Sequence, residues 1–325
     1  MSKSVNIDRY PGLRPFEESE RFMFFGRSME LEELSQAVNI NDLFVIHGES
    51  GLGKSSLINA GLIPVLREKG FYPVLIRFKE RNKPPLQQVL HELKKLLKDI
   101  GNGEALKEEN KLWVWVKLMN SVKLKPVLIF DQFEEFSYFN TEDRLVLVKE
   151  LAALLSPRIP DYARDITPGP EADPSFSWFT QPKVKLLFSL RSDRISILED
   201  FSELMPAMLR SRYQLKPILL EQVEQIVVMP AVMESFNSIH FNSSPFQYQP
   251  ALINDVIDVV KDKKRNTVET TQLQMICQEI ESMVKQRQEE GEEKICVTQN
   301  DLPKEKLEDF VNDFYRKQLE KIHNN

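Results

Sequence analysis

A short stretch rich in glycine, followed by a lysine and a serine, is the part of this sequence that most directly indicates chemistry. Residues 48–55 read Gly-Glu-Ser-Gly-Leu-Gly-Lys-Ser and match the pattern G-x-x-x-x-G-K-[ST]. Glycines let successive backbone N–H groups turn inward toward phosphate oxygens. In such loops the lysine reaches the β- and γ-phosphates, and the hydroxyl that follows binds Mg²⁺. We therefore expect a phosphate loop, or P-loop, made of Gly48, Glu49, Ser50, Gly51, Leu52, Gly53, Lys54, Ser55 and Ser56. Lys54 is also a candidate catalytic residue, and Ser55 a candidate metal ligand.

The flanks of this loop give the pattern its meaning. The apolar run 43–46 has the length and composition of a strand buried on both faces. The residues from Ser55 to Gly70 are expected to form a helix, whose N-terminus adds a positive dipole end to the loop. Strand, glycine loop and helix in this order are the context that phosphate binding requires.

A second candidate site lies where another apolar run ends in acids. Residues 127–130 are followed by Asp131, and Glu134 and Glu135 come shortly after. An aspartate at this place holds Mg²⁺ in P-loop proteins. One of the two glutamates is expected to polarise the attacking water, with Glu134 favoured and Glu135 as the alternative. The alternative is that both are solvated acids at the start of a helix, where they favour its N-terminus.

Arg191 follows the apolar run 184–190. Ligands of parallel sheets bind beyond the carboxyl ends of the strands, so Arg191 is expected to face the γ-phosphate and to stabilise charge during transfer. The alternative is a surface arginine paired with Asp193. Arg210 and Arg212 are weaker candidates for arginines that act on a neighbouring subunit.

The elements that must position these residues alternate between strands and helices, which predicts a parallel sheet flanked by helices in an α/β fold. Beyond Pro217 only helical periods remain. Between Ser156 and Pro182 six prolines indicate a mobile loop. The expected strands are 43–46, 74–76, 127–130, 184–190 and 213–215. The expected domains are an N-terminal segment (1–40), a P-loop core (41–216, with the loop at 157–182) and an all-helical domain (217–325).

Composition narrows the class of protein. The chain has 325 residues, 42% hydrophobic content and a net charge of −6, without a basic stripe, so nucleic-acid binding is not expected. Two cysteines suggest reduced thiols. Because the sequence shows neither a signal peptide nor an apolar run of about 18–20 residues, we expect a cytoplasmic protein without a membrane segment.

With these features in place, the sequence resembles the bacterial novel STAND branch of P-loop NTPases, which are signal-transduction ATPases. The resemblance covers nearly the whole chain. It rests on Tyr-Pro-Gly-Leu-Arg-Pro-Phe (10–16), Phe-Phe-Gly-Arg (24–27), the P-loop, Asp-Gln-Phe-Glu-Glu-Phe (131–136), Leu-Arg-Ser-Asp (190–193), Pro-Ala (230–231) and Thr-Gln-Leu-Gln (271–274).

The resemblance implies more than the residues do. Phe25, Gly26 and Arg27 would lie at the adenine of ATP or ADP, and the helical domain would be a lid. ATP would drive assembly into a homo-oligomer and hydrolysis would reset it, in signalling and in many cases in defence against phage. Family members continue into sensor domains and many carry an effector. We therefore expect the sensor and effector outside this sequence.

Three other functions are compatible with parts of the sequence. The first is a scaffold that binds nucleotide without turnover of its own. The second is a GTPase, which would need Asp-x-x-Gly and [Asn/Thr]-Lys-x-Asp motifs that do not occur in usable places. The third is a DNA-remodelling or initiator ATPase, which the acidic net charge disfavours.

Overall fold

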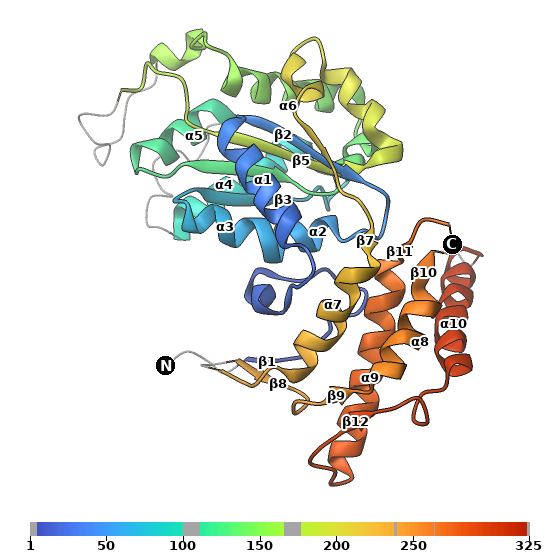
Figure 1. The fold of residues 1–325 in the computed structure, drawn as a ribbon. Coiled ribbons are helices and arrows are strands. Elements are labelled where there is room, and N and C mark those ends of the chain that lie inside the picture. Colours follow the sequence, from blue (N-terminus) through green and yellow to red (C-terminus); the bar gives the residue numbers. More distant parts are fainter. Residues whose placement is uncertain (1–4, 100–110, 166–176, 237–238, 263, 324–325) are drawn as a thin grey trace. The chain divides into compact units, whose positions relative to one another are not determined.

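The apolar runs form a parallel sheet, which confirms the predicted α/β fold. In the computed structural model (Figure 1), which describes residues 5–99, 111–165, 177–236, 239–262 and 264–323, the strand order is β3-β4-β5-β2-β6. Every pair of neighbouring strands is parallel. The strands are β2 Leu43–Gly48, β3 Tyr72–Ile76, β4 Pro126–Phe130, β5 Lys185–Arg191 and β6 Arg212–Gln214. Each lies within two residues of its predicted bounds.

The described residues fall into two compact units. We call Met29–Glu49 together with Leu62–Leu215 the sheet unit, and Met1–Ser28, Ser50–Gly61 and Lys216–Asn325 the helical unit. The expected N-terminal segment 1–40 is therefore divided at Ser28, and most of the P-loop groups with the helical unit.

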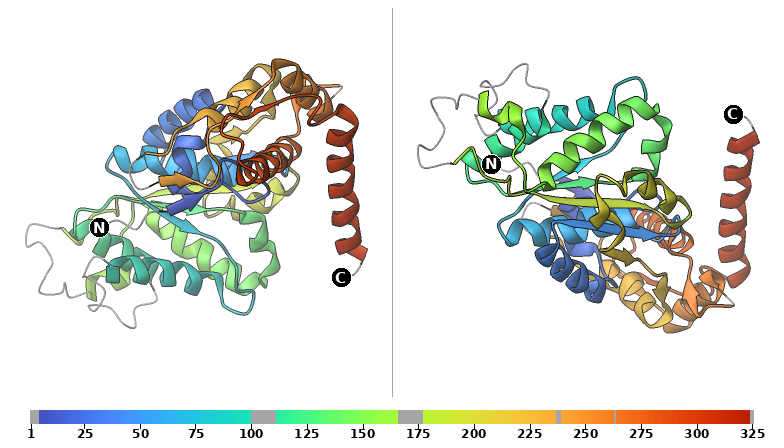
Figure 2. Two further views of the ribbon diagram at one scale, coloured as in Figure 1. Left: turned by 90° about the horizontal axis from the view of Figure 1, so that it is seen from below. Right: turned by 90° about the horizontal axis from the view of Figure 1, so that it is seen from above.

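Helices cover both faces of the sheet. On one face lie α4 Pro85–Asp99, α5 Leu112–Ser121 and α6 Thr141–Leu155, and on the other α1 Ser28–Ile40 and α3 Ile63–Glu68 (Figure 2). All residues of β4 are buried, as expected for a central strand covered on both faces. Trp113 and Trp115 of α5 are each 1% exposed and belong to the core of this unit.

The helix after the P-loop begins at Lys54, one residue before the predicted start. It comprises α2 Lys54–Ser56, a wider π-helical stretch Leu57–Leu62, and α3. It ends before Gly70, whose φ of +77° is the left-handed conformation common just past a helix end.

Shorter helical turns complete the sheet unit. They are the 3₁₀ turns Phe133–Tyr138, Asp161–Asp165, Ser192–Phe201 and Pro206–Leu209. The turn Asp161–Asp165 lies in the proline-rich segment 157–182. Residues 166–176 of that segment, where we expected a mobile loop, lie outside the described residues.

The helical unit is built from α7 Leu220–Val232, α8 Pro250–Val260, α9 Thr270–Glu289 and α10 Lys304–His323, joined by the 3₁₀ turn Glu18–Met23 near the N-terminus. It also contains strands of two or three residues, which the prediction of helices alone missed because alternation cannot be recognised over so short a run. They pair as β1 Val5–Ile7 with β8 Ile239–Phe241, β9 Gln247–Tyr248 with β12 Cys296–Val297, and β11 Thr267–Val268 with both β7 Ile218–Leu219 and β10 Lys261–Asp262.

A fully buried arginine fixes the N-terminal segment within the helical unit. Arg9 donates from Nη1 to the carbonyl oxygens of Pro230 (2.7 Å) and Met233 (2.8 Å), where α7 ends. A cation at this position binds carbonyls that lack a helical partner and complements the helix dipole. Glu281 of α9, 1% exposed, accepts the backbone N–H of Arg9 at 3.0 Å. Among the described residues, no helix combines the length and the apolar character needed to cross a bilayer.

Candidate functional site

The carboxyl edge of the sheet gathers three of the features found in the sequence. Gly48, the last residue of β2, is the register partner of Arg191 on β5. Phe130, the last residue of β4, pairs with Phe188 of β5, and Asp131 follows it directly. With neighbouring strands about 4.8 Å apart, Arg191 is one strand from the start of the P-loop. Asp131 is two strands away, about 10 Å across the sheet, and follows a residue that is level with Val45 rather than with Gly48. Gly48, Asp131 and Arg191 therefore lie along the carboxyl edge of the sheet, whose strands β2, β3 and β5 are labelled in Figure 1.

The P-loop backbone takes the conformation that its glycines permit. Gly51 has a φ of +81° and Gly53 a φ of +84°, which L side chains rarely adopt. A Cβ added at Gly53 would meet no heavy atom of the described residues within 4 Å. Gly53 is thus required by backbone conformation rather than by crowding. Lys54 begins the helix that follows.

Within the helical unit, a buried arginine holds the P-loop backbone. Arg27, 3% exposed, donates from Nη2 to the carbonyl oxygen of Leu52 (3.1 Å) and from Nη1 to that of Lys216 (2.9 Å). A Cβ at Gly51 would lie 2.9 Å from Oγ1 of Thr271 in the first turn of α9. The loop is therefore held by a buried guanidinium, and Thr271 of α9 lies beside Gly51.

The Phe25-Gly26-Arg27 segment, expected at an adenine, packs against the helical unit. Phe25 lies on the core of this unit. Gly26, with a φ of +81°, accepts a hydrogen bond from Nε2 of Gln222 (2.9 Å), and a Cβ there would lie 2.6 Å from Cδ1 of Ile226. These contacts account for the glycine, and the adenine contact stays a prediction.

Ser56, predicted to bind nucleotide, has a structural contact. Its Oγ accepts the backbone N–H of Phe16 at 3.2 Å. Nδ2 of Asn59 donates to the Phe16 carbonyl oxygen, also at 3.2 Å. The helix that follows the P-loop thus holds the end of the Tyr-Pro-Gly-Leu-Arg-Pro-Phe motif.

Asp131 has a partner that the sequence did not reveal. It is 1% exposed, and its Oδ2 accepts hydrogen bonds from Nε (3.0 Å) and Nη2 (2.7 Å) of Arg77. Its Oδ1 is buried and has no hydrogen-bond partner within the described part of the chain. Arg77 directly follows β3 as Asp131 follows β4, and Ile76 and Phe130 are register partners. The position of Arg77, a charged residue directly after a predicted strand, is the sequence feature from which this pairing with Asp131 could have been predicted.

The two candidate bases lie on the 3₁₀ turn Phe133–Tyr138, anchored by the buried rings of Phe133 and Phe136. Oε2 of Glu134 is buried, and no described residue hydrogen-bonds to it. Burial and the nearby Glu134 carboxylate raise the pKa of Glu135 above its usual value. A carboxylate with a raised pKa accepts a proton more readily near neutral pH.

Arg191 forms an ion pair with Asp193, the alternative to a γ-phosphate contact that the sequence left open. Its Nε and Nη2 donate to the two carboxylate oxygens of Asp193, both at 2.9 Å, and these hydrogen bonds lower the pKa of Asp193. The Arg191 side chain is 44% exposed. Arg191 therefore lies at the carboxyl edge of the sheet, as predicted for a γ-phosphate contact, but its side chain is paired with Asp193. Arg210 and Arg212 are exposed on the sheet unit.

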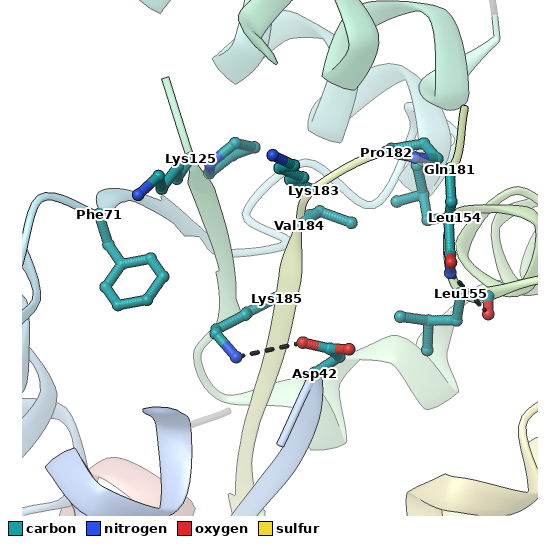
Figure 3. Close-up of a pocket in the computed structure, with 11 residues that line it drawn as sticks. Asp42, Phe71, Lys125, Leu154, Leu155, Gln181, Pro182, Lys183, Val184 and Lys185 are labelled. Atoms are coloured by element: carbon teal, nitrogen blue, oxygen red, sulfur yellow. Dashed lines mark hydrogen bonds and ion pairs between the residues drawn. The ribbon is translucent and has the colours of Figure 1, made fainter. Parts of the chain in front are cut away.

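A pocket of about 360 Å³ lies at the opposite, amino edge of the sheet (Figure 3). Asp42, Pro126 and Lys185, at the beginnings of β2, β4 and β5, line it together with Lys125 and Lys183. Nζ of Lys185 lies 3.1 Å from Oδ1 of Asp42. Because the P-loop leaves the other edge, this pocket is separate from the candidate site.

Comparisons with known proteins agree with this geometry. The model of a family described as Novel STAND NTPase 1 matches residues 10–243. No curated protein sequence matches the chain. Among solved structures, it is similar to the Walker-type ATPase of Pyrococcus abyssi (13% identity, TM-score 0.53, covering 96% of this chain and 79% of that one). It is also similar to the ORC2 protein of Aeropyrum pernix in ADPNP–ADP complexes (14% identity, TM-score 0.57, 94% and 69%). At these identities the likeness shows the fold.

Proposed function

This chain belongs to the novel STAND NTPase 1 family, and from that membership we propose that it is a regulatory ATPase switch. It binds ATP and ADP with Mg²⁺ at the P-loop and hydrolyses ATP slowly. The observation that carries the proposal is the loop backbone. Gly53 has a φ of +84°, which L side chains rarely adopt, and stands directly before Lys54 and the start of a helix. Inward N–H groups and a helix N-terminus favour a phosphate group.

The residues present fit a magnesium ion. Mg²⁺ is usually held by one or two protein oxygens, substrate phosphates and waters. The hydroxyl of Ser55 and the unpartnered Oδ1 of Asp131 are of this kind. When bound, Mg²⁺ neutralises charge on the phosphates. Asp131 would face the ion through Oδ1, and Ser55 would do so from the start of the helix.

Turnover is assigned to groups at the carboxyl edge of the sheet. Glu134 accepts the proton of the attacking water, with Glu135 as the alternative. Arg191 exchanges its bonds to Asp193 for the γ-phosphate and stabilises charge during transfer. Lys54 neutralises the β- and γ-phosphates. Phe25, Gly26 and Arg27 are proposed to form the wall on the adenine side.

The helical unit is proposed to be the part that responds to nucleotide. Support comes from Gly51, which lies beside Thr271 of α9, and from Arg27, which holds both Leu52 and Lys216. A ligand that moves the loop backbone therefore acts on the helices of the same unit. We propose that the helical unit serves as a lid and that ATP favours a homo-oligomer. Sensor and effector would be provided outside this sequence, in signalling that includes defence against phage.

Binding to wild type and Lys54→Ala tests the proposal. Mg·ATP, Mg·ADP and Mg·GTP are titrated, and light scattering is recorded on the same samples. Adenine-selective binding that is lost in Lys54→Ala, with a larger mass in ATP, is the expected result. Binding without any change in mass would refute ATP-driven assembly but not nucleotide binding. The absence of nucleotide binding by wild type would refute the whole proposal.

Phosphate release separates the switch from a scaffold that binds nucleotide without turnover. The pairing of Arg191 with Asp193 is the observation that favours the scaffold, because it occupies the arginine expected at the γ-phosphate. Glu134→Gln should retain binding and stop release. If Glu134→Gln and Glu135→Gln both hydrolyse ATP normally, the assignment of the base is wrong. Binding by wild type without release under conditions that allow assembly would support the scaffold.

A further inference from the structure

We propose that Arg77 is a positioning residue for the magnesium-binding carboxylate. It holds Asp131 through Oδ2 and thereby leaves Oδ1 to face the metal ion. The inference rests on the proposed function, because it assigns Asp131 to Mg²⁺. It concerns a residue for which the sequence motifs suggested no role.

The geometry fixes both the backbone and the side chain of Asp131 to the end of β3. The backbone N–H of Asp131 donates to the carbonyl oxygen of Ile76 at 3.0 Å. Nε and Nη2 of Arg77 converge on Oδ2 at 3.0 and 2.7 Å. Three hydrogen bonds from two consecutive residues therefore determine where the carboxylate lies, and all of them are within the sheet unit.

The distribution of these bonds over the two oxygens is uneven. Both side-chain bonds go to Oδ2, and Oδ1 is buried without a partner in the described residues. A buried carboxylate oxygen that nothing satisfies is unfavourable unless a ligand completes it. The guanidinium is thus placed so that it orients the carboxylate without covering the oxygen that a cation needs.

Charge balance supports the same assignment. Asp131 is 1% exposed, and a buried carboxylate requires a counter-charge. The nearby acids Glu134 and Glu135 add negative charge, so Arg77 is needed whether or not a metal ion is present. Arginine keeps its proton in proteins, so the counter-charge does not depend on pH. With its side chain 23% exposed, Arg77 lies at the rim of the site and contacts Asp131 rather than the reacting atoms.

Arginine is better suited to this task than lysine. Two N–H groups of a planar guanidinium meet one oxygen and fix the rotation of the carboxylate, whereas an ammonium group fixes only a distance. Arg77→Lys should therefore preserve the charge of the pair but not its orientation, and Arg77→Ala should remove both.

The first test needs no nucleotide. Thermal unfolding is measured for wild type, Arg77→Ala, Asp131→Asn and the double variant. Arg77→Ala alone leaves a buried charge unpaired, so its melting temperature should drop, and Asp131→Asn in the same chain should reverse most of that drop. Additive effects of the two substitutions would overturn the ion pair that underlies the proposal.

The second test measures magnesium dependence directly. The dissociation constant of a fluorescent ATP analogue is determined with excess MgCl₂ and with EDTA. The constant in EDTA divided by the constant in MgCl₂ reports the contribution of Mg²⁺ to binding. Arg77→Ala and Asp131→Asn should each lower this ratio by at least about tenfold, because partners that orient metal ligands commonly contribute 10–100-fold to metal affinity. The dissociation constant of Arg77→Ala in EDTA should equal that of wild type. The ratio for Arg77→Lys should lie between those of wild type and Arg77→Ala.

Arg158→Ala, which removes an arginine that is 82% exposed in the same unit, is the matched control and should leave the ratio unchanged. If Arg77→Ala keeps the full ratio or increases it, the guanidinium is dispensable for the metal or competes with it, and the proposal is wrong. If wild type binds no nucleotide, the proposed function is wrong. If wild type binds and only the ratio in Arg77→Ala contradicts the expectation, the role of Arg77 alone is wrong.

Discussion

Replacing Arg27 by methionine should destabilise the helical unit and release the P-loop. The guanidinium is 3% exposed and donates to the carbonyl oxygens of Leu52 and Lys216 at 3.1 and 2.9 Å. A buried hydrogen bond from a charged donor contributes about 1.5–3 kcal/mol, so the loss of two costs about 3–6 kcal/mol of unfolding free energy. Methionine keeps much of the side-chain volume, which limits any additional cost from a cavity.

The position of the tryptophans allows this loss to be assigned to one unit. All three tryptophans of the chain, Trp113, Trp115 and Trp178, belong to the sheet unit. Urea unfolding followed by tryptophan fluorescence therefore reports on the sheet unit, whereas far-UV circular dichroism reports on both. For Arg27→Met we expect the dichroism transition to move to lower urea, ahead of the fluorescence transition. Nucleotide affinity should fall as well, because Leu52 belongs to the P-loop.

Arg21→Met is the matched control, since Arg21 is an exposed arginine of the same unit. Substitutions at exposed sites usually change stability by no more than about 0.5 kcal/mol. Arg27→Lys should lose part of the stability, because one ammonium group lacks the fork that reaches two carbonyls. A loss for Arg27→Met no larger than that for Arg21→Met would refute the role of the guanidinium.

Two further predictions concern a glycine and a buried lysine. Gly26→Ala should lower the melting temperature more than Gly70→Ala: both glycines have a φ near +80°, but only at Gly26 would a Cβ meet Ile226, at 2.6 Å. The left-handed backbone alone costs about 1–2 kcal/mol of stability at either position. The additional loss in Gly26→Ala comes from the clash with Ile226, so a second substitution, Ile226→Ala, should remove that additional loss. Burial, with a smaller effect of Lys183, lowers the pKa of Lys117 to about 8. Between about pH 8 and the ordinary value of 10.5, the unfolded chain binds a proton at Lys117 that the folded chain does not, so Lys117 contributes stability that increases with pH. Equilibrium unfolding of wild type and Lys117→Met is compared across this range: the stability of wild type relative to the variant should increase with pH, and a constant difference would contradict the assignment to Lys117.

Much of the sheet unit could be predicted because its signals are local. The run Val127–Phe130 is continuous and apolar, and the structure places it in an interior strand of the sheet with every residue buried. The glycines at 51 and 53 were expected to give the loop its backbone, and both have positive φ. The family was also predicted from the sequence, and it is confirmed by the match over residues 10–243. The roles of the individual site residues stay predictions.

Contacts between residues distant in the sequence could not be predicted. Arg77 and Asp131 are 54 positions apart, and Arg9 and Glu281 are 272 apart. No periodicity links such pairs, because they come together only when separate strands or helices pack. The short strands of the helical unit escaped prediction for a related reason, since pairing with a distant partner defines them.

The sequence by itself indicated which residue types are suited to phosphate chemistry and determined which strand each one follows. A strand that ends in a glycine loop or an aspartate specifies local backbone and local charge, and both are written in consecutive residues. Only the tertiary structure decided which oxygen of Asp131 is left open, and that a buried Arg27 holds the P-loop. Those outcomes depend on which side chains meet in a low-dielectric interior, where each buried charge and carbonyl needs a partner supplied by another part of the chain.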